Sequence, residues 1–386
     1  MLRIAVITGY FPSSAEPWQG RSAYQTLRVL VREAEVRVFY PHARYPSLFK
    51  LRSRSYQQLD ASYSPPDVSA SYFDYCALPL LSRPFNGWMA ARALLPAVRA
   101  FAPDLIFSYF LYPDGYAALR ISKTLGVPLV AEGIGSDINR IGGFVTAMHT
   151  RAVLRKADYL ITVSHDLRAK AIAMGASAET TRAIHNGCDL AVFHPGDRLD
   201  ARRKLELDLS AEVIVYIGRI DRKKGLRELV EAAVSLRSKR PNLHTYLIGE
   251  GPDRPLIESA IQANNAASYV HAMPACAFDE VALWMAASNI VTLPSYMEGL
   301  PNVVLEALSC GRPVVATNVG GIPEILNDEC GRLVPPRDAR ALAQALASVL
   351  DKGWNANAIA ARGRRSWEDV AAELREVFDS LLSAHP

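Results

Sequence analysis

Two glutamates eight positions apart, Glu298 and Glu306, lie in the segment that most suggests chemistry. Residues 294–311 have the pattern of a strand end, a tight loop, a helix and a glycine stop. The first amides of such a helix are unpaired and partly positive, which makes them a seat for phosphate. A partly buried Glu306 would need partners such as sugar hydroxyls. Taken separately, each glutamate could instead be a solvated or capping residue.

Two cations precede this segment. Arg219 and Lys224 follow an apolar run that ends at Ile217, and both can reach a diphosphate from the carboxyl end of a strand. An ordinary basic surface loop is the alternative. Gly249 and Gly251 follow the next apolar run, where glycine lets the backbone approach a ligand closely, although glycine turns alone are weak evidence.

These segments need a scaffold, and short apolar runs alternate with amphipathic stretches along most of the chain. Such alternation predicts parallel sheets covered by helices on both faces. The predicted strands are 4–7, 36–40, 105–109, 129–131, 159–163, 213–217, 245–248, 290–293 and 314–316. The predicted helices are 21–32, 116–125, 144–156, 166–174, 226–236, 254–263, 280–287, 303–309 and 367–382.

The 386 residues suit two domains, because a single core rarely grows beyond about 250–300 residues. We predict an α/β fold with two Rossmann-like, doubly wound domains and an inter-domain cleft. The predicted domains are 1–195 for the acceptor and 196–365 for the nucleotide-sugar donor. Residues 366–386 are predicted to form a C-terminal helix that crosses back to the first domain.

Composition indicates the class of protein and the compartment in which we expect it. Half of the residues are hydrophobic and 21% are charged, which is typical of packed cores and not of disorder. We expect no signal peptide and no membrane span. Five scattered cysteines without a C-x-x-C pair, and no D-x-D pair, predict no metal, no cofactor and a reducing cytoplasm.

The net charge of +4 is unevenly distributed. Residues 1–189 carry 21 Lys and Arg against 14 Asp and Glu, whereas the remainder carries 22 against 25. This is either ordinary solvated surface or a basic half that faces an anionic membrane or a diphosphate-bearing acceptor. The mixed apolar and basic segment 45–54, with Arg52 and Arg54, is the local candidate for membrane contact. No nucleic-acid partner is expected.

The C-terminal half resembles the retaining glycosyltransferases of family 4, whose two-Rossmann architecture is called GT-B. The matching motifs cover about 150 residues in the order and spacing of the family. They are Gly218-Arg219 with Lys224-Gly225, Gly249-Glu250-Gly251-Pro252, the pair Glu298 and Glu306, Gly320-Gly321-Ile322-Pro323-Glu324 and Gly331-Arg332-Leu333-Val334-Pro335.

The resemblance implies a role for each matching residue. Arg219 and Lys224 would neutralise the donor diphosphate, and Glu298 would contact the transferred sugar. Glu306 would hold the ribose hydroxyls, and the amides of Gly299 and Leu300 would lie near sugar and phosphate. Fixed cations and helix amides can stabilise such a leaving group without a metal.

The N-terminal half matches the family more loosely. Residues 9–12 with Gly20 resemble its first glycine loop, which would bring Gly20 close to the donor phosphate. Residues 135–137 resemble a segment that often carries a preceding histidine, but Ile134 occupies that position here. Asp137 is the candidate that orients the acceptor, or it simply caps the next helix.

We therefore expect a retaining, metal-independent hexosyltransferase that uses a nucleotide-sugar, with UDP as its nucleotide. Its acceptor would be a glycan or a lipid-linked molecule in bacterial polysaccharide or cell-envelope synthesis. The expected location is the cytoplasm or the inner face of the membrane. A nucleotide-sugar epimerase, or a non-catalytic nucleotide- or carbohydrate-binding protein on the same scaffold, is the alternative.

Overall fold

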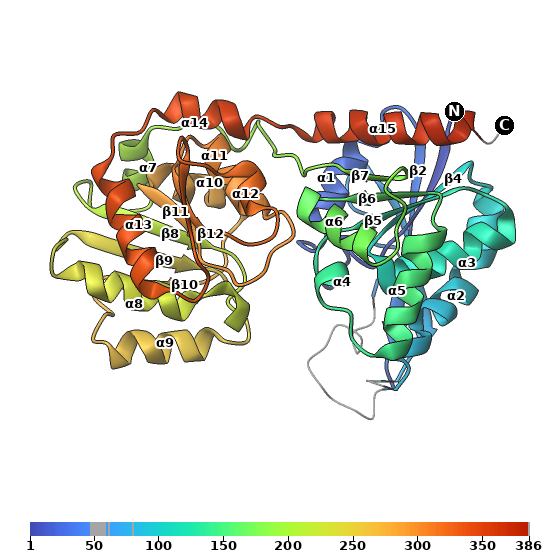
Figure 1. Ribbon diagram of the computed structural model, residues 1–386, viewed down its shortest axis with the longest axis horizontal. Coiled ribbons are helices and arrows are strands. Elements are labelled where there is room, and N and C mark those ends of the chain that lie inside the picture. Colours follow the sequence, from blue (N-terminus) through green and yellow to red (C-terminus); the bar gives the residue numbers. More distant parts are fainter. Residues whose placement is uncertain (47–58, 61, 79–80, 385–386) are drawn as a thin grey trace. The chain divides into compact units, whose positions relative to one another are not determined.

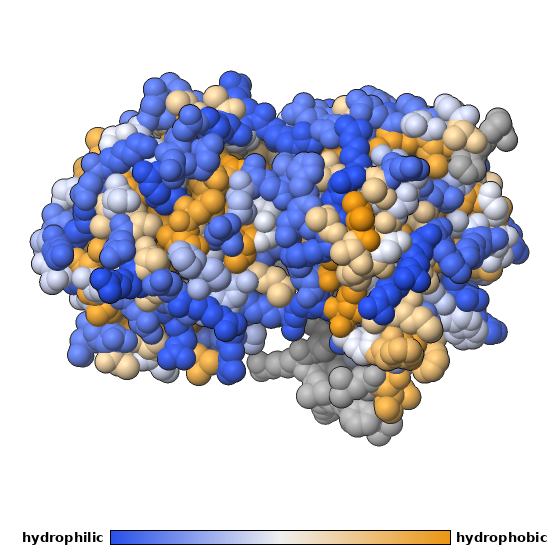
Figure 2. Space-filling view, in the orientation of Figure 1, coloured by the Kyte–Doolittle hydropathy of each residue, from blue (hydrophilic) through white to orange (hydrophobic). Residues whose placement is uncertain are grey.

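The computed structural model describes residues 1–46, 59–60, 62–78 and 81–384. The chain forms two compact units (Figure 1). Unit 1 comprises Met1–Asn186 with Trp367–Pro386, and unit 2 comprises Gly187–Ser366. Most of the surface seen in Figure 2 is hydrophilic, with scattered apolar areas on both units. Most of the predicted membrane-contact segment 45–54, including Arg52 and Arg54, lies outside the described residues.

Unit 1 is built on a seven-stranded parallel sheet with the order β3-β2-β1-β4-β5-β6-β7. Its central strands are apolar at nearly every position, as expected for a sheet with helices on both faces. The strands are β1 (Arg3–Ile7), β2 (Glu35–Arg44), β3 (Ser69–Cys76), β4 (Leu105–Tyr109), β5 (Leu129–Gly133), β6 (Tyr159–Thr162) and β7 (Thr181–Ala183).

The helices of unit 1 include one from the far end of the chain. Helix α15 (Trp367–Ser383) packs on α1, and its apolar face joins the core beneath the sheet. The remaining helical segments are α1 (Arg21–Leu30), η2 (Arg83–Phe85), α2 (Asn86–Phe101), η3 (Leu111–Gly115), α3 (Tyr116–Leu125), α4 (Ser136–Asn139), α5 (Phe144–Lys156) and α6 (His165–Ala173).

Unit 2 has a six-stranded parallel sheet with the order β10-β9-β8-β11-β12-β13. Its strands are β8 (Glu212–Ile217), β9 (Leu243–Ile248), β10 (Val270–Met273), β11 (Ile290–Leu293), β12 (Val314–Thr317) and β13 (Gly331–Val334). Its helical segments are α7 (Arg198–Lys204), η4 (Arg222–Lys224), α8 (Leu226–Arg237), α9 (Arg254–Ala263), α10 (Phe278–Ala287), α11 (Asn302–Ser309), α12 (Ile322–Ile325), α13 (Ala339–Asp351) and α14 (Ala356–Gly363).

The predicted fold class of two doubly wound α/β domains is confirmed by these sheets. In both units the first strand lies inside the sheet. The next two strands are added on one side of it, and all later strands are added on its other side. The reversal falls between β1 and β4 in unit 1 and between β8 and β11 in unit 2. Loops at the carboxyl ends of the two strands diverge at such a point and leave room for a ligand.

The boundary between the units differs from the prediction. It falls between Asn186 and Gly187, not between residues 195 and 196. The reason is that Cys188 and Phe193 are buried in the core of unit 2. Among the described residues, none of the helices has the length and apolar character needed to cross a bilayer.

Candidate functional site

The strand reversal of unit 2 carries a partly buried ion pair. Lys224 follows β8 and Glu298 follows β11, and the Lys224 Nζ lies 2.7 Å from the Glu298 Oε1. Their side chains are 23% and 13% exposed, so the pair is only partly hydrated. The sheet thus unites two predicted site residues that are 74 positions apart in the sequence.

Lys224 is positioned by a short turn fixed at both ends. The Asp221 carboxylate accepts the Lys223 amide at 2.9 Å and so caps η4. Gly225 follows with φ 63°, and a Cβ there would lie 2.0 Å from the carbonyl oxygen of Pro294. The Tyr296 amide donates to the Lys223 carbonyl at 2.7 Å. The loops after β8 and β11 therefore contact each other through their backbones.

Glu298 is held from the opposite side by the loop after β12. A Cβ on Gly320, at φ 55°, would lie 2.2 Å from the Glu298 carbonyl oxygen. The neighbouring Gly321 amide donates to the Gly299 carbonyl at 2.7 Å. Bulkier residues at this glycine pair would displace the loop that carries Glu298 and Gly299.

Arg219 lies at the same edge but reaches outward. Its side chain is 70% exposed, with its Nε 3.9 Å from an Asp221 carboxylate oxygen. Its backbone is fixed, because the buried Tyr216 hydroxyl donates to the Arg219 carbonyl at 2.7 Å. An exposed guanidinium on a fixed backbone can swing toward an incoming anion. Its predicted role at the donor diphosphate stays a prediction.

Gly249 and Gly251 have a structural reason to be glycine. A Cβ at Gly249 would lie 1.9 Å from the Gly218 carbonyl oxygen, and one at Gly251 would lie 2.0 Å from that of Ile220. Both glycines thus let the loops after β8 and β9 pack together. Close approach to a ligand is not needed to explain them, and their predicted contact with a donor stays a prediction.

Helix α11 follows Glu298 after three residues. Pro301 occupies the position before the first helical residue, and Gly311 lies just beyond the end with φ 69°. Leu300 is buried at the entry to the helix. Glu306 is half-buried near the end of the helix. Burial raises the pKa of the nearby Cys310 thiol to about 12, and the negative charge of Glu306 contributes to this rise.

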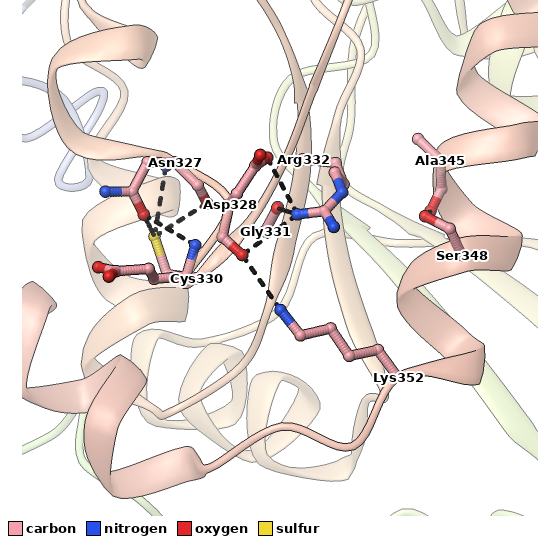
Figure 3. A network of polar contacts seen from close by, with 9 residues as sticks. Asn327, Asp328, Cys330, Gly331, Arg332, Ala345, Ser348 and Lys352 are labelled. Carbon is pink, nitrogen blue, oxygen red and sulfur yellow. Dashed lines mark hydrogen bonds and ion pairs between the residues drawn. The ribbon is translucent and has the colours of Figure 1, made fainter.

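Arg332 belongs to the matching motifs but has another partner (Figure 3). Its guanidinium contacts the Asp328 carboxylate at 3.0 Å, and Lys352 donates to the Asp328 carbonyl. These residues surround the start of β13, whereas Lys224 and Glu298 follow strand ends. In a parallel sheet those are opposite edges, so this network stabilises the turn into β13 and not the candidate site.

Unit 1 has a corresponding carboxylate at its own strand reversal. Asp114, after β4, accepts the amide of Gly9, after β1, at 2.6 Å. Gly20 precedes α1 with φ 64°, and a Cβ there would lie 2.2 Å from the Tyr10 carbonyl oxygen. Packing of the first loop therefore requires Gly20, and its approach to a donor phosphate stays a prediction.

Asp137 lines a cavity of about 830 Å³ in unit 1. Its buried carboxylate accepts the backbone amides of Leu111, Ile134 and Gly135 at 3.0, 3.2 and 2.9 Å. It does not act as the N-cap of α4, in which it lies, nor of α5. It instead fixes the loops that follow β4 and β5 and so shapes the wall of the cavity. Burial raises the pKa of Asp137, while these amides oppose the shift.

Several residues that position the site escaped sequence analysis. Asp114 and Tyr216 act on backbone groups distant in sequence or hidden in an apolar run, so no local motif marks them. Tyr296 precedes Glu298 by two positions, and its hydroxyl contacts the Glu228 carboxylate at 2.6 Å. The Arg337 guanidinium covers the Tyr296 ring at 4.7 Å. Of these residues, only Tyr296 could have been noticed in the sequence, as an aromatic residue in the loop that carries Glu298.

The edge of unit 2 brings together groups that can bind an anion and hydroxyl groups. It combines Lys224, Arg219, the partly buried carboxylate of Glu298 and the start of α11 around one strand reversal. Cations and helix amides bind phosphate oxygens, and a carboxylate accepts hydroxyl groups. A phosphorylated sugar or nucleotide offers both kinds of group.

Two family models match the chain. The model described as glycosyl transferases group 1 matches residues 211–352, and the one described as Glycosyltransferase Family 4 matches residues 19–192. Together they span most of both units.

Relatives of this chain are named as glycosyltransferases. TuaC of Bacillus subtilis (strain 168), named "putative teichuronic acid biosynthesis glycosyltransferase", is 28% identical over 89% of this chain and 88% of its own. A D-inositol 3-phosphate glycosyltransferase of Segniliparus rotundus is 34% identical over 73% of this chain and 67% of its own. The match to the enzyme of the same name from a Nocardioides strain spans about half of that relative, 54%.

Solved structures share the fold. Sucrose-phosphate synthase from Thermosynechococcus elongatus superposes with a TM-score of 0.82 at 23% identity, covering 100% of both chains. Anabaena Alr3699/HepE, solved in complex with UDP-glucose, has a TM-score of 0.74 at 18% identity and covers 98% of this chain and 99% of its own. At these identities the likeness concerns the architecture of the chain.

Proposed function

Because this chain belongs to the glycosyltransferases of family 4, with the GT-B fold, we propose that it uses a UDP-sugar as donor and retains the anomeric configuration. The donor is held at the edge of unit 2 around Lys224 and Glu298. The acceptor is held in the cavity of unit 1 that Asp137 lines. The product is a bacterial polysaccharide or cell-envelope glycan.

One observation carries the donor site: the ion pair between Lys224 and Glu298 at the strand reversal of unit 2. A partly buried lysine without a ligand needs a counter-charge, and Glu298 supplies it. An arriving diphosphate is a stronger partner for the ammonium group. Glu298 is then released to accept hydrogen bonds from hydroxyls of the sugar.

The proposed transfer step exchanges one bond to the anomeric carbon for another. The bond between that carbon and the diphosphate oxygen breaks, and a bond to the acceptor oxygen forms. The acceptor's proton passes to the departing phosphate, so UDP leaves and no enzyme nucleophile is required. Lys224, Arg219 and the first amides of α11 stabilise the charge that develops on the diphosphate. We propose that they do so without a metal.

The choice of UDP and of a bacterial glycan is supported by relatives. HepE has been solved with UDP and with UDP-glucose, and TuaC is named for teichuronic acid biosynthesis. Retention follows from the family resemblance of the motif with Glu298 and Glu306. The identity of the transferred sugar and of the acceptor has to be determined by a screen.

Thermal unfolding with UDP, GDP, ADP or a nicotinamide dinucleotide, without added metal, tests the donor site. A nucleotide at about 100 times its dissociation constant stabilises the folded state by roughly 2.7 kcal/mol. We expect UDP to raise the melting temperature, and Lys224→Ala and Glu306→Ala to reduce that rise. Arg222→Ala is the matched control, because Arg222 is 80% exposed and pairs with Asp253.

Transfer is then measured with a UDP-sugar panel, and the anomeric configuration of the product is read by NMR. Lys224→Ala should slow transfer roughly 10²- to 10³-fold through lost charge stabilisation. Parent rates in both variants would contradict the site. Stabilisation by the dinucleotide alone would contradict the transferase, and UDP binding without transfer to any acceptor would favour a non-catalytic binding protein.

A further inference from the structure

Tyr296 joins the loop that carries Glu298 to another segment of unit 2 at two points. Its hydroxyl donates to the Glu228 carboxylate and lies 2.6 and 2.7 Å from the two carboxylate oxygens. Its amide donates to the Lys223 carbonyl at 2.7 Å. A hydroxyl that donates to a carboxylate makes a short, charge-assisted hydrogen bond, which is stronger than one between neutral groups. Tyr296 therefore fixes its loop through both its backbone and its side chain.

The surroundings of the Tyr296 hydroxyl keep it protonated, as a hydrogen-bond donor must be. Burial, together with the hydrogen bond to Glu228 and the charge of that residue, raises the pKa of Tyr296 to about 12. The charges of Arg337 and Arg227 act in the opposite direction. The hydroxyl thus remains a donor to Glu228 at neutral pH.

Arg337 contacts Tyr296 from a strained position. Its φ is 62°, a left-handed conformation that costs free energy in a residue with a Cβ. Its guanidinium lies 4.7 Å from the centre of the Tyr296 ring, within the range of a cation–π interaction. Arg337 precedes α13 and Glu228 lies in the first turn of α8, and these two helices pack against each other (Figure 1). The Tyr296 ring is therefore held where both helices begin.

The segments that carry Lys224 and Glu298 are joined by their ion pair and also by Tyr296. In the proposed donor complex the ion pair opens, because the diphosphate takes the Lys224 ammonium group. The two hydrogen bonds of Tyr296 use the Lys223 carbonyl and the Glu228 carboxylate, so they survive this exchange. They lie two residues from Glu298 and still hold its loop when the ion pair no longer does.

We propose that Tyr296 is a positioning residue that keeps Glu298 at the donor site after the donor has opened the ion pair with Lys224. Glu228 and Arg337 hold Tyr296 in turn. The Glu298 carboxylate then stays where it can accept hydroxyl groups of the transferred sugar. The inference rests on the proposed function, because the ion pair opens only if a diphosphate binds beside Lys224.

Hydrogen–deuterium exchange of the amides in residues 294–300, with and without saturating UDP, tests this role. The variant Tyr296→Phe removes the hydroxyl and keeps the ring beneath Arg337. Without UDP we expect the variant to exchange nearly as slowly as the parent, because the ion pair still holds the loop. With UDP we expect its exchange to be roughly tenfold faster than that of the parent, as for the loss of one hydrogen bond to a charged group. A tyrosine that only stabilised the fold would raise exchange equally with and without UDP.

Variants of Glu228 show whether the hydrogen bond itself is responsible. Glu228→Leu should behave as Tyr296→Phe does, whereas Glu228→Gln should stay closer to the parent, because its amide oxygen still accepts from the hydroxyl. Combining Tyr296→Phe with Glu228→Leu should add nothing to either change, since both remove the same bond.

The matched control is Tyr269→Phe. The Arg237 guanidinium also lies 4.7 Å from the Tyr269 ring. Tyr269 precedes β10, however, whereas Lys224 follows β8, so the two lie at opposite edges of the parallel sheet. We expect loop exchange in this control to match the parent with and without UDP.

Steady-state transfer with the UDP-sugar that the screen identifies gives a second readout. Tyr296→Phe should lower kcat roughly 10- to 100-fold, because a displaced Glu298 no longer orients the sugar. UDP affinity, measured by calorimetry, should stay near the parent value, because UDP carries no sugar for Glu298 to contact. UDP affinity that falls in step with kcat would contradict a role confined to positioning Glu298.

The inference is overturned if Tyr296→Phe and the parent exchange equally in the presence of UDP, or if the variant exchanges faster to the same extent without it. The proposed function is judged on the parent alone. A parent that does not bind UDP would contradict the donor site, and the inference would fall with it. Where the parent binds UDP, the behaviour of Tyr296→Phe decides the inference by itself.

Discussion

Asp137 and Glu132 are both buried in unit 1, five residues apart, yet their surroundings differ. Asp137 receives three backbone amides, which favour its charged form. Burial, with the neighbouring charge of Asp137, raises the pKa of Glu132 to about 8. One carboxylate organises loops, whereas the other is held in its neutral form at neutral pH.

Replacing Asp137 by Asn should weaken unit 1. An amide has one acceptor oxygen, and its NH₂ group would face backbone donors. We expect the free energy of unfolding to fall by about 2–3 kcal/mol. Urea denaturation measures this change. The control Asp166→Asn removes an ion pair with Lys170 on the exposed side of α6 and should cost less than about 0.5 kcal/mol. Equal stability of Asp137→Asn and the parent would show that the three amides need no carboxylate.

Glu132 predicts a pH dependence with a definite sign. Its ordinary pKa is 4.5, so between pH 4.5 and about 8 the folded chain keeps a proton that the unfolded chain has released. The free energy of unfolding therefore falls as pH rises through that window. Glu132→Gln removes this titration. We expect the variant to gain more than about 1 kcal/mol over the parent between pH 5 and pH 8. Parallel stability curves for the two proteins would assign Glu132 an ordinary pKa.

At the scale of elements, the candidate site is a set of loops packed backbone to backbone. Gly225 is the closest such contact between the loops that carry Lys224 and Glu298. Gly225→Ala should displace one of them, and we expect a loss of about 2 kcal/mol or more in stability together with weaker UDP binding. Gly353→Ala is the control, because a Cβ there meets no atom within 4 Å. Calorimetry with UDP measures the effect on the site. Unchanged binding in Gly225→Ala would separate the loop contact from donor affinity.

Sequence periodicity gave many elements to within a few residues, because buried strands and amphipathic helices are local patterns. Strands 105–109 and 290–293 and helices 116–125, 144–156 and 254–263 match the prediction. Helix α2 was not predicted, since Pro96 lies inside it, and β3, half-exposed at many positions, was not predicted either. Such elements depend on packing by distant segments, which a single sequence does not reveal.

The site was predictable to a different degree. Glu298 and Lys224 were found from a motif with known spacing, and the sheet order brings them together. The reason for Gly249 and Gly251 was not predictable. A glycine is needed wherever another group comes close to the backbone. The sequence does not show whether that group belongs to the protein or to a ligand.

At the scale of the whole molecule, the end of the chain completes the unit in which it begins. Trp367, Leu374 and Phe378 of α15 are buried in the core of unit 1, and the Phe378 ring lies 5.5 Å from that of Phe107 on β4. Arg182 adds ion pairs to Glu373 and Glu376. Unit 1 therefore depends on a helix made after all of unit 2.

This dependence predicts an asymmetric response to changes in α15. Phe378→Ala opens a cavity in unit 1 and should cost about 3–5 kcal/mol there, whereas Ser380→Ala on the exposed face of the same helix should cost almost nothing. Unit 2 contains none of the residues that contact Phe378 in this core, so UDP binding should survive. Limited proteolysis with calorimetry separates the two effects: we expect early cleavage within residues 1–186 and an intact, UDP-binding fragment from unit 2. Loss of both units together in Phe378→Ala would mean that they unfold as one cooperative body, and the donor site would then depend on α15 as well.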